Sequence, residues 1–369
     1  MKEASVEPRK LDHIKICLEK PVQAQDKTAG LEDIELIHNA IPEISKKDVD
    51  LSLDFLDHNL DAPIIIAAMT GGHLIAKKIN ATLAEAARKL NIGLGVGSQR
   101  AALEDPGLVD TFRVVREIAP DAFIIGNLGA PQLSRGYSLR EIEKATKMID
   151  ANAIAIHLNA LQEAIQPEGE TDFSGVIDAI GDISKKSSVP IIAKETGAGI
   201  AREEAQILEK SGIAAIDVGG AGGTSWAGVE TYRAVESEDE SRNRIGKTFW
   251  DWGIPTAVSA FEVAQSTKLP VIATGGVRSG LDAAKLIALG ASVVGVAFPL
   301  LQSAYRGDVN HVINTLNTMI EELRIAMHLV GAKTVGELKG ARVIISGKTG
   351  QWLRLRGYEL SNFANRTPR

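Results

Sequence analysis

The chain has 369 residues, of which 44% are hydrophobic and 24% are charged, and this composition is typical of a soluble globular protein with a large core. Disordered and fibrous classes are excluded. The formal net charge of −6 argues against nonspecific binding to nucleic acid or anionic membranes, so a bound anion must be held locally. The single cysteine, Cys17, excludes an intramolecular disulfide and Cys-rich zinc modules, and it favours a reducing compartment.

The sequence pattern does not predict a secretory signal or a membrane span. Residues Met1 to Lys10 are charged and lack the apolar core of a secretory signal. The longest nearly apolar stretch, Ala291 to Leu301, is shorter than the roughly 20 residues that a membrane-spanning helix needs. We therefore expect a cytoplasmic protein with neither a membrane nor a nucleic acid as its partner.

Short runs rich in β-branched residues recur along the chain, with helical segments between them. They repeat about every 29 residues, which is near the size of one βα unit. Apolar runs without strict alternation are typical of parallel strands buried on both faces. Eight such units favour a (β/α)8 TIM barrel over an open sheet. The eight runs are Pro63 to Ala68, Ile92 to Val96, Ala122 to Gly126, Ala153 to His157, Pro190 to Lys194, Ala214 to Val218, Pro270 to Thr274 and Ser292 to Ala297.

Helix signals lie between these runs. Residues Ile75 to Leu90 are rich in helix formers and place apolar side chains three and four residues apart, which predicts an amphipathic helix. Ser279 is a predicted N-cap for a helix over Leu281 to Leu289, because Asp282 can complete a capping box and Gly290 follows the end.

We expect one domain over 1–369, with an N-terminal arm at 1–60, a barrel core at 61–298, and the last barrel helix with a C-terminal helical extension at 299–369. One unit is longer than the others because residues 219–255 separate the sixth strand from its helix. The charge run Glu236 to Arg244 within it predicts a solvated flap, with an active-site lid as the alternative.

In a barrel of this kind the active site lies at the carboxyl ends of the strands. The loop after the seventh strand contains Gly275, Gly276 and Arg278 ahead of a capped helix, where backbone N–H groups can bind a phosphate. A plain tight turn is the alternative. Lys194 ends the fifth strand, and burial of its charge favours an anionic ligand, with a salt bridge to a neighbouring carboxylate such as Glu195 as the alternative.

The loop after the fourth strand offers neutral hydrogen-bonding groups on His157, Asn159 and Gln162. Glu163 is the one carboxylate there, and it can anchor Mg²⁺ if a substrate phosphate supplies further oxygens. Its alternative role is that of an ordinary carboxylate at a helix start.

Three basic residues precede the barrel, namely Arg9, Lys10 and His13. They form either a solvated surface cluster or, together with Arg100 and His157, the surroundings of a second anion, if the arm folds over the barrel mouth.

In these loops the chain resembles the type 2 isopentenyl diphosphate isomerases, relatives of the FMN-dependent α-hydroxy acid oxidases. Any one Gly-rich match is weakly specific, but six matches in register from residue 9 to residue 278 are strongly specific. The matching segments are Arg9-Lys10-x-x-His13, Met69-Thr70-Gly71-Gly72, Gly97-Ser98-Gln99-Arg100, His157-Leu158-Asn159-x-x-Gln162-Glu163, Gly219-Gly220-Ala221-Gly222-Gly223-Thr224-Ser225-Trp226 and Gly275-Gly276-Val277-Arg278. One departure is Ala160, where this family often has Pro.

The resemblance implies an FMN site in the barrel mouth, with Lys194 at the anionic N1/O2 side of the flavin and the Gly-Gly-Val-Arg loop at its phosphate. The implied FMN contacts are Ala68, Met69, Thr70, Gly71, Ser98, Asn127, Lys194, Thr224, Gly275, Gly276, Arg278, Ala297 and Phe298.

The resemblance also implies that the enzyme interconverts isopentenyl and dimethylallyl diphosphate, with no net electron transfer. Reduced FMN would be the acid and base, NADPH would be the reductant, and Glu163 would bind Mg²⁺. Gln162 and His157 are the implied catalytic side chains, and the family's tetramers and larger assemblies imply a homo-oligomer, a tetramer or octamer. The implied diphosphate contacts are Arg9, Lys10, His13, Ser98, Gln99, Arg100, His157, Asn159 and Gln162.

Related activities fit the sequence less well. An α-hydroxy acid oxidase would need a His base and an Arg after the sixth strand, where this chain has only small residues over 219–223. An inosine monophosphate dehydrogenase would need a cysteine nucleophile in a barrel loop, and Cys17 lies outside the barrel. A flavin oxidoreductase acting on a phosphorylated substrate and a noncatalytic phosphate-binding barrel are the remaining alternatives.

Overall fold

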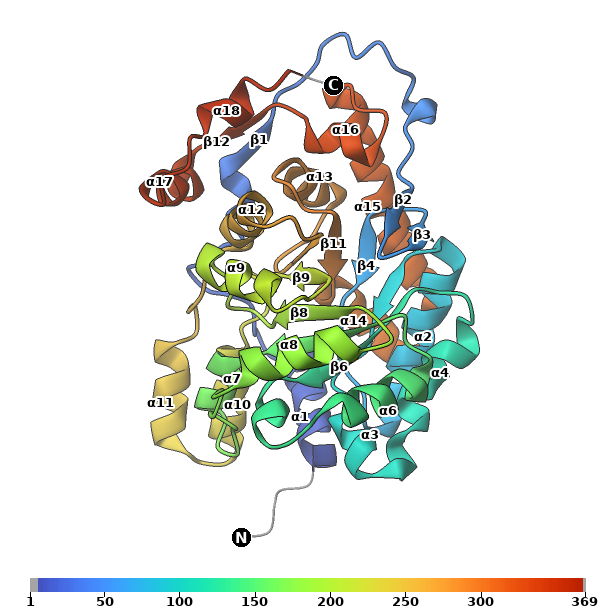
Figure 1. The fold of residues 1–369 in the computed structure, drawn as a ribbon, viewed down its shortest axis with the longest axis vertical. Coiled ribbons are helices and arrows are strands. Elements are labelled where there is room, and N and C mark those ends of the chain that lie inside the picture. Colours follow the sequence, from blue (N-terminus) through green and yellow to red (C-terminus); the bar gives the residue numbers. More distant parts are fainter. Residues whose placement is uncertain (1–5, 368–369) are drawn as a thin grey trace.

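Eight parallel strands close into a barrel in the computed structural model, which describes residues 6–367 (Figure 1). Each strand overlaps one predicted run, and β11 pairs with β4 through Val294 and Ile64 to close the ring. The predicted (β/α)8 barrel is therefore confirmed. Its strands are β4 (Ile64–Ile66), β5 (Gly93–Gly95), β6 (Ile124–Gly129), β7 (Ala153–Leu158), β8 (Ile191–Glu195), β9 (Ala215–Asp217), β10 (Val271–Thr274) and β11 (Val293–Val296).

Helices surround the barrel and connect its strands. Two predicted helices are confirmed: α2 covers the Ile75 segment, and α13 begins with the predicted capping box of Ser279 and Asp282. The helices around the barrel include α2 (Leu74–Leu90), α3 (Arg100–Glu104), α4 (Asp110–Ile118), α5 (Pro131–Ser134), α6 (Leu139–Ile149), α7 (Ala160–Ile165), α8 (Val176–Lys186), α9 (Arg202–Lys210), α12 (Thr256–Ser266), α13 (Gly280–Ala288), α14 (Phe298–Arg306) and α15 (Val309–Val330).

The charge run, predicted as a solvated flap, is largely helical. It spans the end of α10 (Trp226–Glu236), a short turn and the first half of α11 (Glu240–Thr248). The two helices pack closely, since a Cβ on Gly246 would lie 2.0 Å from the Thr231 hydroxyl. Most side chains of the run are exposed, and Arg242 donates to the Ile165 carbonyl on α7 (2.6 Å). The run is thus solvated on one side and attached to the barrel rim on the other.

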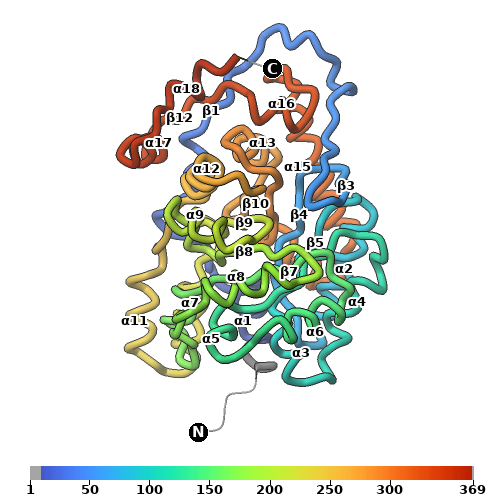
Figure 2. Tube along the Cα trace, in the orientation of Figure 1, coloured from blue at the N-terminus to red at the C-terminus, as the bar shows by residue number. Residues whose placement is uncertain are grey.

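The N-terminal arm runs along both ends of the barrel. Helix α1 (Val6–Glu19) lies at the mouth beside α10, while β1 (Ile34–Leu36) pairs antiparallel with β12 (Val343–Ile345) of the C-terminal extension. Figure 2 shows β1 and β12 side by side, far from α1. The remaining helices of the extension are α16 (Val335–Lys339), α17 (Gly347–Leu355) and α18 (Ser361–Ala364). Within residues 6–367, none of the helices combines the length and apolarity that crossing a bilayer requires.

A β-hairpin closes the end of the barrel opposite the mouth. Its strands β2 (Leu53–Phe55) and β3 (His58–Leu60) are joined by two residues with φ of 48° and 65°, as a type I′ turn requires. Phe55 is 2% exposed and meets the Phe123 ring edge-on, with 5.8 Å between ring centroids. The hairpin therefore buries apolar side chains inside the base of the barrel and leaves the mouth open.

Replacing Phe55 by Ala is expected to lower the free energy of unfolding by about 3–5 kcal/mol, because it leaves a cavity in this closed base. Chemical denaturation measures the change. Phe249→Ala is the matched control, since that ring is 37% exposed and its loss should cost no more than about 0.5 kcal/mol. Equal effects of the two substitutions would contradict a packing role for the hairpin.

Candidate active site

A large cavity opens at the carboxyl ends of the barrel strands, with an open volume of about 1660 Å³. Arg100 and His157, which were predicted to surround one anion, line this cavity. Lys194 and Arg278, which were predicted to bind another anion, line the same cavity. The structure thus brings together residues from distant parts of the sequence. The predicted site residues that line the cavity are Lys10, His13, Ala68, Met69, Thr70, Ser98, Arg100, Asn127, His157, Asn159, Gln162, Glu163, Lys194, Thr224, Gly275, Gly276, Arg278, Ala297 and Phe298.

Three predicted residues are not placed in the cavity wall. Gln99 is fully buried, accepting from the Asn127 backbone N–H and donating to the Ala145 carbonyl, both at 2.9 Å. It therefore ties the loop after β5 to β6 and α6 instead of facing a ligand. Gly71 packs against the Phe112 ring. A Cβ added to Gly71 would lie only 1.9 Å from that ring. The backbone of Arg9 lies in α1, but its side chain is outside the described residues.

Glycines shape the loop that was predicted to bind a phosphate, which consists of Gly275, Gly276 and Arg278 and is called the Arg278 cradle below. Gly275 and Gly276 have φ of 118° and 72°, conformations that favour glycine. A Cβ on Gly223 would lie 2.5 Å from the Gly276 nitrogen, so the loops after β9 and β10 can meet only because both carry glycine. Arg278 beside them donates to the Val277 carbonyl (2.9 Å) and lies over the Phe298 ring at 5.6 Å. Backbone N–H groups and a fixed guanidinium fit a phosphate monoester.

Lys194 lies on β8, between β7 and β9, and its side chain lines the cavity. Its Nζ lies 3.2 Å from Asp217 Oδ2 and donates to the Glu195 carbonyl oxygen at 2.8 Å. The alternative of a salt bridge to a neighbouring carboxylate is therefore confirmed, with Asp217 as the partner in place of Glu195. Asp217 was missed because it lies inside an apolar strand run and belongs to none of the motifs.

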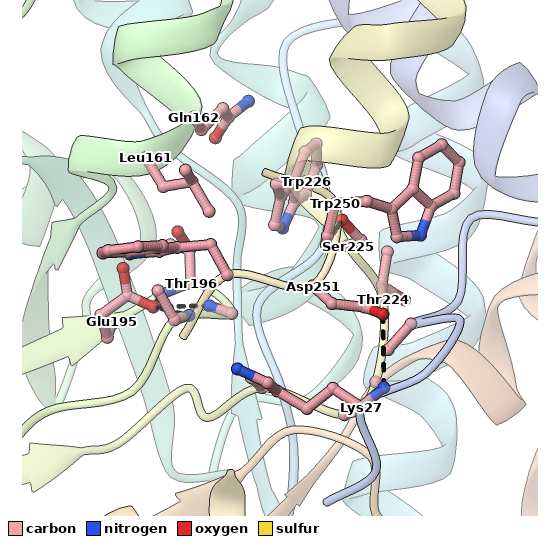
Figure 3. Close-up of a pocket in the computed structure, with 17 residues that line it drawn as sticks. Lys27, Leu161, Gln162, Glu195, Thr196, Thr224, Ser225, Trp226, Trp250 and Asp251 are labelled. Atoms are coloured by element: carbon pink, nitrogen blue, oxygen red, sulfur yellow. Dashed lines mark hydrogen bonds between the residues drawn. The ribbon is translucent and has the colours of Figure 1, made fainter. Parts of the chain in front are cut away.

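The Glu195 carboxylate points away from the Lys194 ammonium. Its Oε2 accepts the backbone N–H groups of three successive residues, 196–198, at 2.5–2.6 Å. Figure 3 shows Glu195 and Thr196 in the wall of a smaller side cavity of about 380 Å³, with Trp226 and Trp250 across it and Lys27 below. Burial raises the Glu195 pKa to about 7, although these N–H groups and the Lys194 charge act in the opposite direction.

A raised pKa makes stability depend on pH. Below about pH 4.5 the Glu195 carboxyl is protonated in both folded and unfolded protein, whereas between about pH 5 and pH 7 only the unfolded chain ionises fully. Stability should therefore fall with rising pH across this window, by an amount on the order of 3 kcal/mol from this residue. Glu195→Gln should remove that contribution, as measured by the difference between wild-type and variant unfolding free energies at pH 5 and pH 8. A difference that is constant with pH would contradict this assignment.

Glu230 on α10 organises the mouth and was not predicted. Its side chain is fully buried and accepts from Gln162 Nε2 (3.1 Å) and Arg233 (2.6 Å), with His13 Nε2 at 2.9 Å. Burial would raise its pKa, but the His13 hydrogen bond and the Arg233 charge outweigh this and lower it to about 2. Burial also lowers the His13 pKa. The ionised carboxylate therefore attaches α1 to α10 and fixes the Gln162 amide, whose oxygen lies 3.5 Å from Asn159 Nδ2.

Indole and imidazole groups complete the cavity wall. Trp226, quoted in a motif but not assigned a role, meets the His13 ring edge-on with 5.3 Å between centroids. His157 Nδ1 lies 2.6 Å from Asn127 Oδ1, so the amide fixes the plane of the imidazole. Arg100 is held by Glu170 (2.8 Å) and Glu104 (2.7 Å) at the edge of the cavity.

Glu163 fits Mg²⁺ only as one ligand among several. Its oxygens accept from Asn159 Nδ2 (2.7 Å), Gln166 Nε2 (2.5 Å) and the Glu170 backbone N–H (2.7 Å). The buried Asn159 Oδ1 has no hydrogen-bond partner among the residues that the structure describes. Within residues 6–367 no three His, Cys, Asp or Glu side chains converge as a metal site. This donor set suits a Mg²⁺ ion that keeps water and substrate phosphate oxygens as its main ligands.

Barrel and cavity together define the class of protein. A family model described as FMN-dependent dehydrogenase matches residues 3–105 and 141–345. The chain therefore belongs to the FMN-dependent dehydrogenase family. The fold is shared with solved structures of a lactate oxidase from Pediococcus acidilactici (TM-score 0.65, 16% identity, 94% of this chain and 96% of that chain) and a flavocytochrome b2 variant (TM-score 0.65, 18% identity, 94% and 88%).

Curated relatives that match nearly the whole chain carry one name. The isopentenyl-diphosphate delta-isomerase of Methanosarcina mazei is 51% identical over 356 residues, covering 96% of each chain. The isopentenyl-diphosphate delta-isomerase of Methanothermobacter thermautotrophicus is 51% identical over 362 residues, covering 98% of this chain and 100% of that protein. The Pyrococcus furiosus isomerase is 50% identical, covering 94% and 89%.

Proposed function

We propose that the protein is an isopentenyl-diphosphate delta-isomerase that interconverts isopentenyl and dimethylallyl diphosphate and uses FMN. The observation that carries the proposal is the single cavity that joins the glycine and Arg278 cradle to a second group of polar and basic side chains around Arg100 and His157. Two anionic ligands can therefore lie in contact. Relatives about 50% identical over nearly the full chain support this activity.

In this proposal the diphosphate is bound by residues from the arm and from two strand loops. Lys10 and His13 reach the cavity from α1, while Ser98, Arg100, His157 and Asn159 reach it from the barrel. Charge-assisted hydrogen bonds from such groups position a diphosphate. The part of α1 that carries His13 would also exclude water from the five-carbon unit.

Proton transfer is the difficult step, because ordinary His and carboxylate groups do not readily protonate an unactivated alkene near pH 7. Reduced FMN supplies this acid–base chemistry when bound. Gln162 lines the cavity, with its Nε2 held by Glu230 and its Oε1 3.5 Å from Asn159 Nδ2, so its fixed amide positions the substrate or relays a proton. His157 orients the substrate on the neighbouring strand.

Three further features belong to the same proposal. Glu163 and the Asn159 amide oxygen bind Mg²⁺ together with the substrate diphosphate. NADPH serves as the reductant that prepares the flavin and is not consumed in each turnover. The protein assembles as a homo-oligomer, a tetramer or octamer.

Anaerobic incubation with isopentenyl diphosphate, FMN, Mg²⁺ and reductant tests the proposal, with NMR following the shift of the double bond. We expect dimethylallyl diphosphate to form in many turnovers for each reductant molecule oxidised. Reductant consumption equal to product formation would instead indicate a flavin oxidoreductase. Binding of FMN and diphosphate without any turnover would indicate a noncatalytic phosphate-binding barrel.

A further inference from the structure

Lys194 and Asp217 form a buried ion pair between neighbouring strands. They face each other in the β8–β9 register, and the Nζ–Oδ2 distance is 3.2 Å. Their side chains are 10% and 8% exposed. The other carboxylate oxygen, Oδ1, accepts the Gly219 backbone N–H at 3.2 Å. The carboxylate is therefore fixed on both sides, and Lys194 faces the cavity while Asp217 does not line it.

The pair limits what the ammonium can offer to a ligand. A lysine ammonium carries three protons. One is donated to the Glu195 carbonyl oxygen (2.8 Å) and a second is directed at Asp217. One proton is left for a ligand in the cavity, and its position is set by the two protein acceptors.

We propose that Asp217 is a positioning residue that orients the Lys194 ammonium toward the flavin and offsets part of its charge, so that it sets how much more tightly the protein binds reduced than oxidised FMN. The inference rests on the proposed use of FMN. A cation beside a flavin favours the reduced form, which carries more negative charge, and a carboxylate behind that cation weakens the effect. Both act strongly because the pair is shielded from water.

The midpoint potential of bound FMN tests the inference. We expect Asp217→Asn, which retains the shape of the side chain and removes its charge, to shift the potential upward relative to the wild type. A tenfold gain in the preference for reduced FMN corresponds to ~30 mV for this two-electron couple. The measurement is an anaerobic dye equilibration of the FMN-loaded protein at pH 6.

Glu195→Gln is the matched control, because it removes the other carboxyl group next to Lys194. That group points away from Nζ, and at pH 6 it is already largely neutral, since its pKa is about 7. The control should keep the wild-type potential. An Asp217→Asn potential that is equal to or below the wild-type value would overturn the inference.

If Asp217→Asn does not fold, the potential is measured on the double variant Lys194→Met Asp217→Asn, because removing both charges leaves neither of them buried and unpaired. Its potential should lie below the wild-type value, because the cationic end of the pair is the end nearer the cavity. An unchanged potential would overturn the inference. Wild-type protein that takes up no FMN in a visible-absorbance titration would instead refute the proposed function, so the two failures are distinguishable.

Discussion

Replacing Gln162 by Ala is expected to lower kcat by about a hundredfold to ten-thousandfold, the range typical of a lost acid–base or proton-orienting group. Uptake of FMN should not change, because Gln162 is not among the residues proposed to contact FMN. Steady-state NMR assays and an FMN titration measure the two quantities separately. The matched control is Gln265→Ala, an exposed glutamine on α12.

The role of Gln162 depends on Glu230, which fixes its amide by a hydrogen bond of 3.1 Å. Because the Glu230 pKa is about 2, the carboxylate stays ionised throughout the working range, and its own titration should not appear in the pH profile of kcat. A Gln162→Ala variant with wild-type kcat would contradict the assignment of the amide to proton transfer.

Glu163→Gln is expected to abolish the stimulation of the reaction by Mg²⁺, so that the rate at saturating Mg²⁺ falls to the metal-free rate. The substitution removes the charged metal ligand. It also places an NH₂ group against the Gln166 and Glu170 donors that the carboxylate now accepts. A Mg²⁺ titration of initial rates measures the effect, and FMN uptake should be retained.

Glu168→Gln is the control for this experiment, because that carboxylate is 29% exposed and pairs with Arg233 outside the proposed metal position. Its Mg²⁺ response should match the wild type. If Glu163→Gln kept a normal Mg²⁺ response, the metal would have to bind elsewhere.

Much of the barrel can be predicted from sequence because its signals are local. A buried parallel strand appears as a short β-branched run, and a capping box such as Ser279 with Asp282 requires only three residues of spacing. The Gly275-Gly276 loop is likewise predictable, since positive φ and close backbone approach both select glycine. These local requirements explain why each strand and the glycine loop after β10 can be predicted from the sequence.

The residues that were missed act through contacts that sequence spacing does not encode. Glu230 meets Gln162 and His13 across 68 and 217 residues, so its importance appears only after α1 and α10 are folded over the mouth. Asp217 appears as the end of a strand until its register with Lys194 is known. Gln99 belongs to a motif yet turns inward, because backbone groups of the neighbouring strand β6 and of helix α6 satisfy its amide.

A crystal structure of the protein with both FMN and isopentenyl diphosphate bound tests the central claim most directly. We predict that the FMN phosphate lies at Gly276 and Arg278, that the diphosphate lies at Arg100 and His157, and that the flavin ring contacts the five-carbon unit in one cavity. Ligands found in separate cavities, or a diphosphate that occupies the cradle and displaces FMN, would contradict it.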